Sequence, residues 1–400
     1  GFHRFFLCLS GCNTHDPDYK KKAVRFVPIT LPVPTETQGP APVSKKTAVV
    51  LFQLGGPDSL DAVEPFLYNL FMDPDIFDFP GAFLARKLFA RRISTRLSKP
   101  VREHYKEIGG RSPINELTQL QADALQRSLR SEGTNATVFV AMRYWHPLTD
   151  EVVRSIRDGA FEQVILLPLY PHFSKATTYS SMNEWNRCIR KHRLGRLPTH
   201  LICCYPNHPL YVEALAENID LTLRTFQGLP REEIDLVFSA HGVPMEFIQN
   251  GDPFRLHIEE TVRSVLSRGA WGCPHILCYQ SKLGPARWLE PSLLGTITDL
   301  AGKGRRHLLV IPVAFVTDHI ETLHEISIEA REEAGRKGIK TFEIMPALND
   351  HPKFIRCLSD LVMARIGSAG NNNPGCHKWW QAAPVNLEPR LCPWYPRQEN

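Results

Sequence analysis

The chain has 400 residues, of which 43% are hydrophobic and 22% are charged, so it can build the cores of two domains of ordinary size. Its 47 basic and 42 acidic residues leave a formal net charge of +5, too mild for nucleic acid but compatible with an anionic membrane surface. No apolar run approaches the roughly 18 residues of a membrane span, and the ten cysteines contain no CxxC pair, which favours reduced thiols in an intracellular compartment.

The two ends of the chain differ in composition from its middle. Residues 1–46 contain a lysine cluster at 20–22 and a proline-rich run, and they predict a disordered extension because they can bury little apolar surface. Acidic residues within this segment weigh against a transit peptide, which is normally poor in them. Residues 367–400 show no periodicity, so we interpret them as a C-terminal tail.

Between these ends, short apolar runs alternate with helical patterns. The runs predict β-strands at residues 47–53, 137–142, 163–169, 200–204, 235–239, 275–279, 307–313 and 341–345. Helices are expected between most of them, for example at 116–131, 210–226 and 254–268. Near-continuous apolar strands separated by helices predict parallel sheets that are covered on both faces.

The two halves of this region resemble each other. Residues 49–57 align with residues 235–244, and residues 164–171 align with residues 308–315, in the same order. We therefore expect an α/β protein with two similar doubly wound domains, at 47–195 and 196–366. Ligands of such domains bind beyond the carboxyl ends of the strands, here in the cleft between the domains.

Residues 64–115 interrupt the first domain with an aromatic run that is followed by cations. The apolar members are Phe66, Leu67, Leu70, Phe71, Phe77, Phe79 and Phe83, and the cations are Arg86, Lys87, Arg91, Arg92 and Arg96. Two interpretations are open for this segment. It forms either a buried helical hairpin, which composition alone favours slightly, or an amphipathic lip that touches a membrane or an apolar ligand.

Ionisable residues follow two of the predicted strands. His241 comes after the strand at 235–239, where doubly wound domains place ligands, although a lone histidine is more often structural. Asp318 and His319 come after the strand at 307–313. Both groups therefore belong at the ligand-binding edge of the second sheet.

Three carboxylates follow on the next helix. Glu321, Glu325 and Glu329 recur every four residues, which places them along one helix face. A solvated acidic face is the ordinary interpretation of such a pattern. Here, however, isoleucine and leucine fill most of the remaining circumference, so we expect a largely buried helix. Buried carboxylates need protons or cations as partners, which favours a metal or proton path.

Residues 239–244 (SAHGVP) and 317–323 (TDHIETL) are similar to the two signature motifs of the ferrochelatases. Further matching stretches lie at 54–57, 108–114, 142–147, 168–171, 177–178 and 279–288. The resemblance covers residues 47–366 in order. It implies a lyase that inserts Fe²⁺ into a porphyrin, with two Rossmann-like domains and the porphyrin in the cleft between them.

The resemblance also implies roles for individual residues. His241 and Glu321 would be catalytic and metal-binding, facing each other across the macrocycle, and an imidazole with a pKa of about 6.5 can accept a proton or bind Fe²⁺ at neutral pH. Which of the two sides handles metal and which handles protons stays open. The implied proton or metal path comprises Asp318, His319, Glu325 and Glu329. The implied porphyrin-binding residues are Leu54, Arg91, Arg92, Arg143, Tyr144, Trp288 and Phe315.

The resemblance further identifies residues 64–115 as the lip by which relatives touch the membrane, in preference to a buried hairpin. Arg91 and Arg92 would pair with the porphyrin propionates, because guanidinium groups bind carboxylates in a bidentate manner. The expected partners are therefore a porphyrin, Fe²⁺ and an anionic membrane surface, with no nucleic acid. The expected location is the cytoplasm, on the inner face of the membrane, with an organelle also open.

The sequence departs from parts of the family pattern in two places. Members with a 2Fe–2S cluster bind it through one internal cysteine and three closely spaced ones at the carboxyl end. Here the internal position is Lys175 and the tail offers Cys376 and Cys392. Because a cluster needs four ligands, we expect no cluster and no other cofactor, Fe²⁺ being a substrate. Leu54 stands where members that act on coproporphyrin commonly carry tyrosine, which together with the apolar lip favours protoporphyrin IX.

Three alternatives are kept. The first is a ferrochelatase for coproporphyrin III. The second is a cobalt chelatase of the cobalamin or sirohaem branch, which would act on a far more acidic tetrapyrrole and would lack the apolar lip. The third is a two-lobed metal or haem binding protein without enzymatic activity. Such a protein would be expected to carry a secretion signal and would not need proton-accepting carboxylates.

Overall fold

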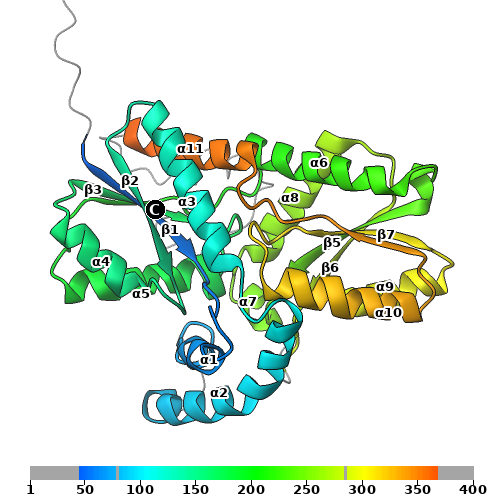
Figure 1. Ribbon diagram of the computed structural model, residues 1–400, viewed down its shortest axis with the longest axis horizontal. Coiled ribbons are helices and arrows are strands. Elements are labelled where there is room, and N and C mark those ends of the chain that lie inside the picture. The colour runs from blue at the N-terminus through cyan, green and yellow to red at the C-terminus, as the bar shows by residue number, and fades with distance from the viewer. Residues whose placement is uncertain (1–44, 78–80, 283–285, 368–400) are drawn as a thin grey trace, which may run out of the picture. The chain divides into compact units, whose positions relative to one another are not determined.

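The computed structural model describes residues 45–77, 81–282 and 286–367, so the predicted extension and tail lie almost entirely outside it. The first sheet and its helices comprise β1 (Thr47–Gln53), α1 (Val63–Phe71), α2 (Ala82–Glu107), α3 (Ile114–Ser131), β2 (Ala136–Met142), α4 (Thr149–Asp158), β3 (Gln163–Pro168), the π-helix η1 (Lys175–Tyr179), α5 (Ser180–Lys191) and β4 (Thr199–Leu201). Figure 1 shows these elements from blue to green.

The second half of the chain repeats this plan. It comprises α6 (Pro209–Leu223), the short 3₁₀ turns η2 (Arg224–Phe226) and η3 (Arg231–Glu233), β5 (Ile234–His241), α7 (Met245–Gln249), α8 (Phe254–Gly269), β6 (His275–Gln280), α9 (Leu293–Gly302), β7 (His307–Pro312), the π-helix η4 (Glu321–Ala330), α10 (Arg331–Arg336), β8 (Thr341–Ile344) and α11 (Pro352–Gly367).

The two sheets have the same strand order. The first runs β2-β1-β3-β4 and the second runs β6-β5-β7-β8, with every described pairing parallel. The two alignments found in the sequence join β1 to β5 and β3 to β7, which occupy equivalent positions. The predicted α/β class with two similar doubly wound domains is therefore confirmed.

The boundary expected at residues 195/196 differs from the structure. β4 pairs with β3, with Val164 opposite Thr199, so the first sheet extends to Leu201. The last helix, α11, packs against α3 and α6 and thus returns to the first half of the chain (Figure 1). A strand of three residues is too short to show a periodicity, and this is why the sequence pattern assigned it to the wrong domain.

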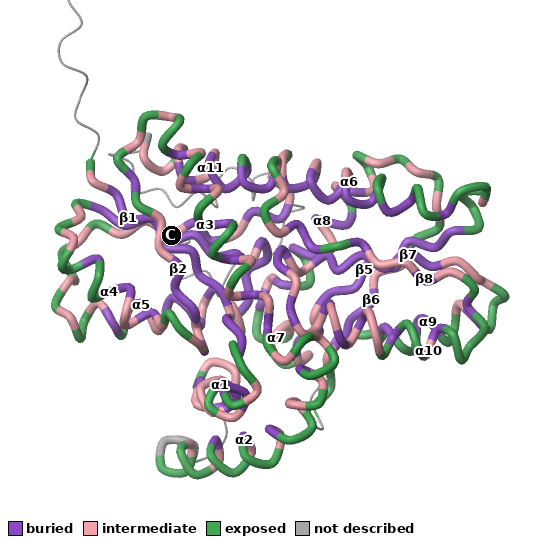
Figure 2. The backbone as a smooth tube through the Cα atoms, in the orientation of Figure 1, coloured by how far each residue is buried: buried purple, intermediate pink, exposed green. Residues whose placement is uncertain are grey.

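Alternating side chains on the strands divide the interior into separate cores. Val49 and Leu51 face one core, whereas Val50 and Phe52 face another, which α4 and α5 close. In the second sheet, Val237 faces a third core under α9, η4 and α10. The core that contains Val49 also includes residues of β5 and β7, so one apolar interior is continuous between the sheets. Figure 2 shows the central strands buried within it.

The segment predicted as a lip forms a helical hairpin of α1 and α2. Phe66, Leu67 and Phe71 on α1 are 3–7% exposed and pack against α2, so this part agrees with the buried-hairpin interpretation. Leu84 and Leu88 on α2 are 79% and 55% exposed. Phe79 and the side chain of Phe83 lie outside the described residues. The exposed apolar surface is therefore on α2 and not on α1. None of the described helices has the length and apolarity needed to cross a bilayer.

The long helix α2 carries a proline within its span. Pro100 lacks the N–H that an interior helical residue donates, and Figure 1 shows the helix turning upward in its second half. Its C-terminal end meets η4, where His324 Nε2 lies 3.0 Å from Glu107 Oε2. The hairpin is thereby connected to the second sheet and its helices.

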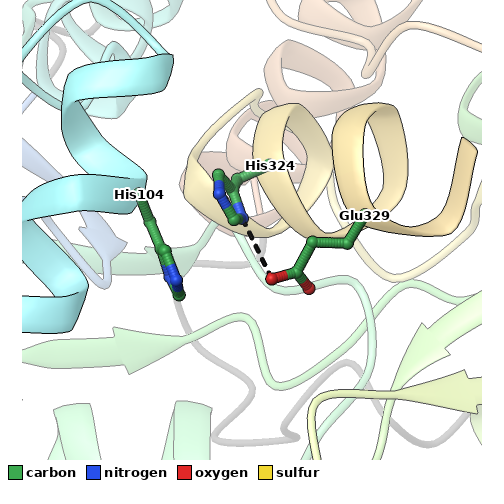
Figure 3. Close-up of side chains that lie close together, drawn as sticks. All are labelled: His104, His324 and Glu329. Atoms are coloured by element: carbon green, nitrogen blue, oxygen red, sulfur yellow. Dashed lines mark ion pairs between the residues drawn. The ribbon is translucent and has the colours of Figure 1, made fainter. Parts of the chain in front are cut away.

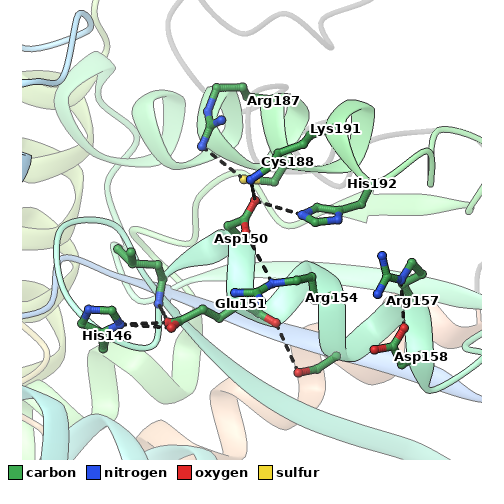
Figure 4. A network of polar contacts seen from close by, with 12 residues as sticks. His146, Asp150, Glu151, Arg154, Arg157, Asp158, Arg187, Cys188, Lys191 and His192 are labelled. Atoms are coloured by element: carbon green, nitrogen blue, oxygen red, sulfur yellow. Dashed lines mark hydrogen bonds and ion pairs between the residues drawn. The ribbon is translucent and has the colours of Figure 1, made fainter.

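A polar network joins α4 to α5 on the outside of the first sheet. Asp150 accepts hydrogen bonds from Lys191 Nζ at 2.8 Å and from His192 Nε2 at 2.9 Å (Figure 4). The hydrogen bond from Lys191, followed by that from His192, lowers the pKa of Asp150 to about 2, although burial opposes the shift. These contacts stabilise the packing of two surface helices and have no part in the site described next.

Candidate active site

The site lies beyond the carboxyl ends of the central strands of the second sheet. β5 ends at His241, which is opposite Gln280 at the end of β6. β7 ends at Pro312, and the chain enters η4 at Glu321. The end of β1 is adjacent, since Gln53 Nε2 donates a hydrogen bond of 3.3 Å to Thr317 Oγ1. This is the edge at which parallel α/β sheets bind ligands.

His241 and Glu321 are in direct contact. His241 Nδ1 lies 2.8 Å from Glu321 Oε2, and the two side chains are 37% and 17% exposed. An aromatic disc between them would need roughly 3.5 Å on each side. The expectation that they face each other across a macrocycle is therefore wrong, and both groups must act on the same face of any bound ring.

Two aromatic side chains stand beside the histidine. The ring centroids of Trp288 and Phe315 lie 6.5 Å and 6.4 Å from that of His241, with interplanar angles of 82° and 75°. Phe315 also contacts His319, at 4.7 Å between centroids. The structure thus brings these two predicted porphyrin-binding residues to the predicted catalytic histidine.

The contact changes the acidity of both partners. Burial alone would lower the pKa of His241, but the negative charges of Glu321 and Glu325 and the hydrogen bond from Nδ1 raise it above its usual value. Burial would raise the pKa of Glu321, but the charges of His241 and His319 lower it, as do the hydrogen bonds from His241 and Ser281. The ionised Glu321 therefore stabilises the imidazolium that forms when His241 accepts a proton.

A second carboxylate lies behind this pair. Burial, followed by the charge of Glu321, raises the pKa of Glu325 to about 7. The Ser281 hydroxyl donates a short hydrogen bond to Glu325 Oε2 and lies 3.4 Å from Glu321 Oε2. Gln280 Nε2 also approaches Glu325 Oε2, at 3.4 Å. Glu325 can therefore gain or lose a proton near neutral pH, next to the ionised pair.

The helix that carries these carboxylates is a π-helix. The sequence predicted an ordinary helical face, but η4 (Glu321–Ala330) has the wider turn that closes between residues i and i+5. Ile326 and Ala330 are fully buried, whereas Glu329 is exposed. π-Helical turns are rare in proteins, and those that occur are often found at functional sites. The acidic face therefore runs from the buried His241–Glu321 pair to the surface.

Asp318 is occupied by contacts that hold the loop before η4. Its Oδ1 accepts a hydrogen bond of 3.0 Å from Thr322 Oγ1, and its Oδ2 accepts one of 2.8 Å from Asn349 Nδ2. These are the contacts of a residue that fixes the start of a helix. The structure does not bring its carboxylate to Glu325 or Glu329, so its role in a path stays a prediction.

His319 lies closer to the reactive pair than Asp318 does. Its Nδ1–H donates to the Thr317 carbonyl oxygen at 3.0 Å, which leaves Nε2 directed at Glu321 Oε1, 3.9 Å away. The ring is 5% exposed and packs against Phe315. His319 therefore lies beside Glu321, at a separation too long for a hydrogen bond.

The structure buries Tyr144 and most of Arg143 in a polar cluster with Asp73. Arg143 lies 2.9 Å from Asp73 Oδ2, and the Tyr144 hydroxyl donates to the same oxygen at 2.6 Å. The Tyr144 side chain is completely buried, and this burial raises the pKa of its hydroxyl. The expected contact between Tyr144 and a macrocycle does not agree with this placement. A buried carboxylate needs both partners, and this explains why the tyrosine points inward.

The remaining predicted porphyrin-binding residues lie apart from His241 or at its margin. Leu54 is half-buried and packs with the hairpin helices. Arg91 and Arg92 are exposed on α2, about 18 to 20 Å along the helix from His104, at 1.5 Å per residue. No contact described in the structure joins either arginine to His241 or Glu321.

Sequence reasoning missed Ser281 and Asp73. Ser281 directly follows β6, the neighbour of the strand that ends at His241, and this position was a usable signal. It has a φ of +66°, a left-handed conformation that is uncommon for residues other than glycine. Asp73 gave no such signal, because its partner Arg143 is 70 residues away in the sequence.

Comparison with known proteins identifies the family of this chain. The family model described as Ferrochelatase matches residues 46–366. Proteins named ferrochelatase from Citrifermentans bemidjiense and Geobacter metallireducens are 47% and 48% identical, each over 80% of this chain and 98% of the relative. The one from Trichodesmium erythraeum is 41% identical over 80% of this chain and 83% of its own. The chain therefore belongs to the ferrochelatase family of metal-chelating lyases, as its two signature motifs predict.

Proposed function

We propose that this protein inserts Fe²⁺ into protoporphyrin IX, releasing protohaem and two protons. The contact of 2.8 Å between His241 and Glu321, in a member of the ferrochelatase family, carries the proposal. Insertion breaks two pyrrole N–H bonds and forms four iron–nitrogen bonds without any change of redox state. The site must therefore accept two protons for each iron that it inserts.

His241 and the carboxylates behind it can do this. When Nδ1–H donates to Glu321, the other ring nitrogen, Nε2, keeps the lone pair that can accept a pyrrole proton. The raised pKa of His241 makes it a stronger base, and Glu325, with a pKa of about 7, can take the proton onward. Nε2 and the Glu321 carboxylate are also ligand types that Fe²⁺ accepts.

Apolar residues at Leu54 and on α2 support protoporphyrin IX over coproporphyrin III. Leu54, at the end of β1, packs in an apolar cluster and offers no hydrogen bond to an extra propionate. Leu84 and Leu88 on α2 present further apolar surface. We expect the ratio kcat/KM for protoporphyrin IX to exceed that for coproporphyrin III by about tenfold or more, equivalent to about 1.4 kcal/mol. A higher ratio for coproporphyrin III in the same anaerobic assay would assign the chain to the first alternative.

We propose that the exposed leucines of α2 insert into a membrane. Leu84 and Leu88 lie near Lys87, Arg91 and Arg92, and each cation near an anionic surface contributes about 1 kcal/mol, screened by salt. Leu84→Asp combined with Leu88→Asp should release the protein from anionic vesicles in a flotation assay. It should also raise the apparent KM for porphyrin without changing that for iron.

A matched control for this test is Leu120→Asp with Leu221→Asp. These leucines are 49% and 54% exposed but lie on α3 and α6, so vesicle binding should persist. If both double variants are released from the vesicles, or if neither is, α2 does not form the membrane contact. Phe71→Asp is unsuitable for the purpose, because Phe71 is only 3% exposed and its loss would destabilise the hairpin.

We propose further that the enzyme works without a 2Fe–2S cluster. Lys175, at the internal ligand position, begins η1 with its ammonium group 5.3 Å from the centre of the Phe247 ring. Cys376 and Cys392 lie outside the described residues. The purified protein should contain no acid-labile sulfide, and a chain that ends at residue 368 should keep full activity. Cluster absorption bands that disappear together with activity on truncation would contradict this.

A further inference from the structure

Two histidines and two glutamates meet where the end of α2 packs on η4, apart from the His241–Glu321 pair. His104 and Glu107 belong to α2, and His324 and Glu329 belong to η4. Figure 3 shows His104, His324 and Glu329 on these two elements. One ligand atom from each of His104, His324 and Glu329 lies within 4.8 Å of the others. The two imidazole rings are stacked, with centroids 4.1 Å apart. The group thus combines nitrogen and carboxylate ligands from two separate elements.

His324 has one satisfied and one unsatisfied nitrogen. Its Nε2 lies 3.0 Å from Glu107 Oε2, and this neighbouring carboxylate favours the tautomer with the proton on Nε2. In the neutral ring, Nδ1 then carries a lone pair. This atom is buried and has no hydrogen-bond partner among the described residues, on a side chain that is 4% exposed. Such an atom costs free energy unless something binds it.

The nearest polar group to this nitrogen cannot satisfy it. Glu329 Oε1 lies 3.6 Å from Nδ1, and an ionised carboxylate has only acceptor atoms (Figure 3). In the neutral ring two acceptor atoms therefore face each other, and their separation of 3.6 Å is too long for a hydrogen bond. A cation bound by both would remove the conflict.

We propose that His104, His324 and Glu329 bind a divalent first-row transition-metal ion such as Zn²⁺, Fe²⁺ or Co²⁺. Imidazole and carboxylate ligands suit these ions. Glu107 would act as the outer carboxylate that receives the other N–H of a ligating histidine and fixes its orientation. The contact between Glu107 and His324 is already present, so the outer carboxylate is in place before any ion binds.

The distances and exposures permit the site to close on an ion. Metal–nitrogen bonds of about 2.0 Å in a tetrahedral site require ligand atoms about 3.3 Å apart. The ligand atoms here lie within 4.8 Å, and the Glu329 side chain is 50% exposed and the His104 side chain half-buried, so both have room to rotate inward. The open side would leave a position for water.

Such an ion would join elements that are distant in the sequence. α2 belongs to the hairpin that follows β1, whereas η4 follows β7. Bound metal would therefore fasten the hairpin to the helix that carries Glu321 and Glu325. Because metal binds the folded chain preferentially, it should raise the melting temperature.

The test is Co²⁺ binding to the full chain, measured by equilibrium dialysis and by visible absorption. His241→Ala is the parent protein, because the His241–Glu321 pair could bind Co²⁺ itself. The parent should bind one Co²⁺ per chain with a rise in melting temperature. Adding His324→Gln or Glu329→Gln should remove both effects, and adding Glu107→Gln should weaken binding about 10- to 100-fold.

The matched control is His275→Gln in the same parent. His275 is exposed at the start of β6, so its replacement should leave Co²⁺ binding unchanged. Circular dichroism would establish that each variant is folded. If His324→Gln does not fold, Glu329→Gln, which changes an exposed residue, still tests the proposal. Absence of Co²⁺ binding by the parent, or equal binding by the folded parent and both ligand variants, would overturn the proposal. Neither result depends on chelatase activity, so the proposed function is judged separately.

Discussion

Replacing His241 with alanine should abolish iron insertion while leaving the protein folded. A positioned proton acceptor typically contributes 10²- to 10⁴-fold to a rate, so kcat should fall by at least about a hundredfold. His241 is the last residue of β5 and its side chain is 37% exposed, so its removal should leave little or no cavity. The measurement is anaerobic formation of haem from Fe²⁺ and porphyrin, with circular dichroism to establish the fold.

His275→Ala is the control for this variant. His275 lies on the neighbouring strand β6 but at its opposite end, and its side chain is exposed. Its loss should leave kcat unchanged. If the His241 variant keeps most of the parent turnover, His241 is neither the proton acceptor nor a required ligand.

Glu321→Gln should lower kcat by one to two orders of magnitude and raise the KM for porphyrin much less. The substitution keeps the shape of the side chain but removes the charge that stabilises a protonated His241, an interaction needed mainly in the transition state. A change confined to KM would instead make Glu321 a binding residue. Glu332→Gln, at an exposed position on α10, is the control and should have no effect.

The same variant should change the acidity of His241 in a defined direction. Burial lowers the pKa of His241, and the charges of Glu321 and Glu325 outweigh it in the native protein. Without the Glu321 charge, the effect of burial should prevail, and the pKa should drop below its value in the unmodified protein. An NMR titration of the His241 ring protons measures this shift. An unchanged pKa would show that the contact of 2.8 Å has no electrostatic consequence.

The sequence predicted the architecture well because buried parallel strands leave a strong local pattern. The runs at 47–53 and 235–239 became β1 and β5, the central strands of two sheets with the same order. The boundary at 195/196 was wrong because β4 has only three residues and depends on its pairing with β3. The lip was predicted from the family resemblance, whereas composition slightly favoured a buried hairpin. Neither could tell that Phe66 and Phe71 on α1 are buried against α2, whereas Leu84 and Leu88 on α2 are exposed.

The site was predicted in its residues but not in its geometry. Strand ends followed by motif residues placed His241, Glu321 and Phe315 at one sheet edge, where they lie together. Their arrangement around a ring depends on side-chain directions, and the expected opposition across the macrocycle was wrong. Asp73 was missed because the charge it neutralises comes from a distant strand end.

The central claim is that this chain inserts Fe²⁺ into a porphyrin at the His241–Glu321 pair. The most direct test is anaerobic incubation of the purified protein with Fe²⁺ and protoporphyrin IX, following porphyrin fluorescence, haem absorption and proton release together. Porphyrin fluorescence should fall as haem absorption rises, with two protons released per iron inserted, and the His241→Ala variant should show none of these changes. A folded protein that binds the porphyrin but forms no haem would contradict it.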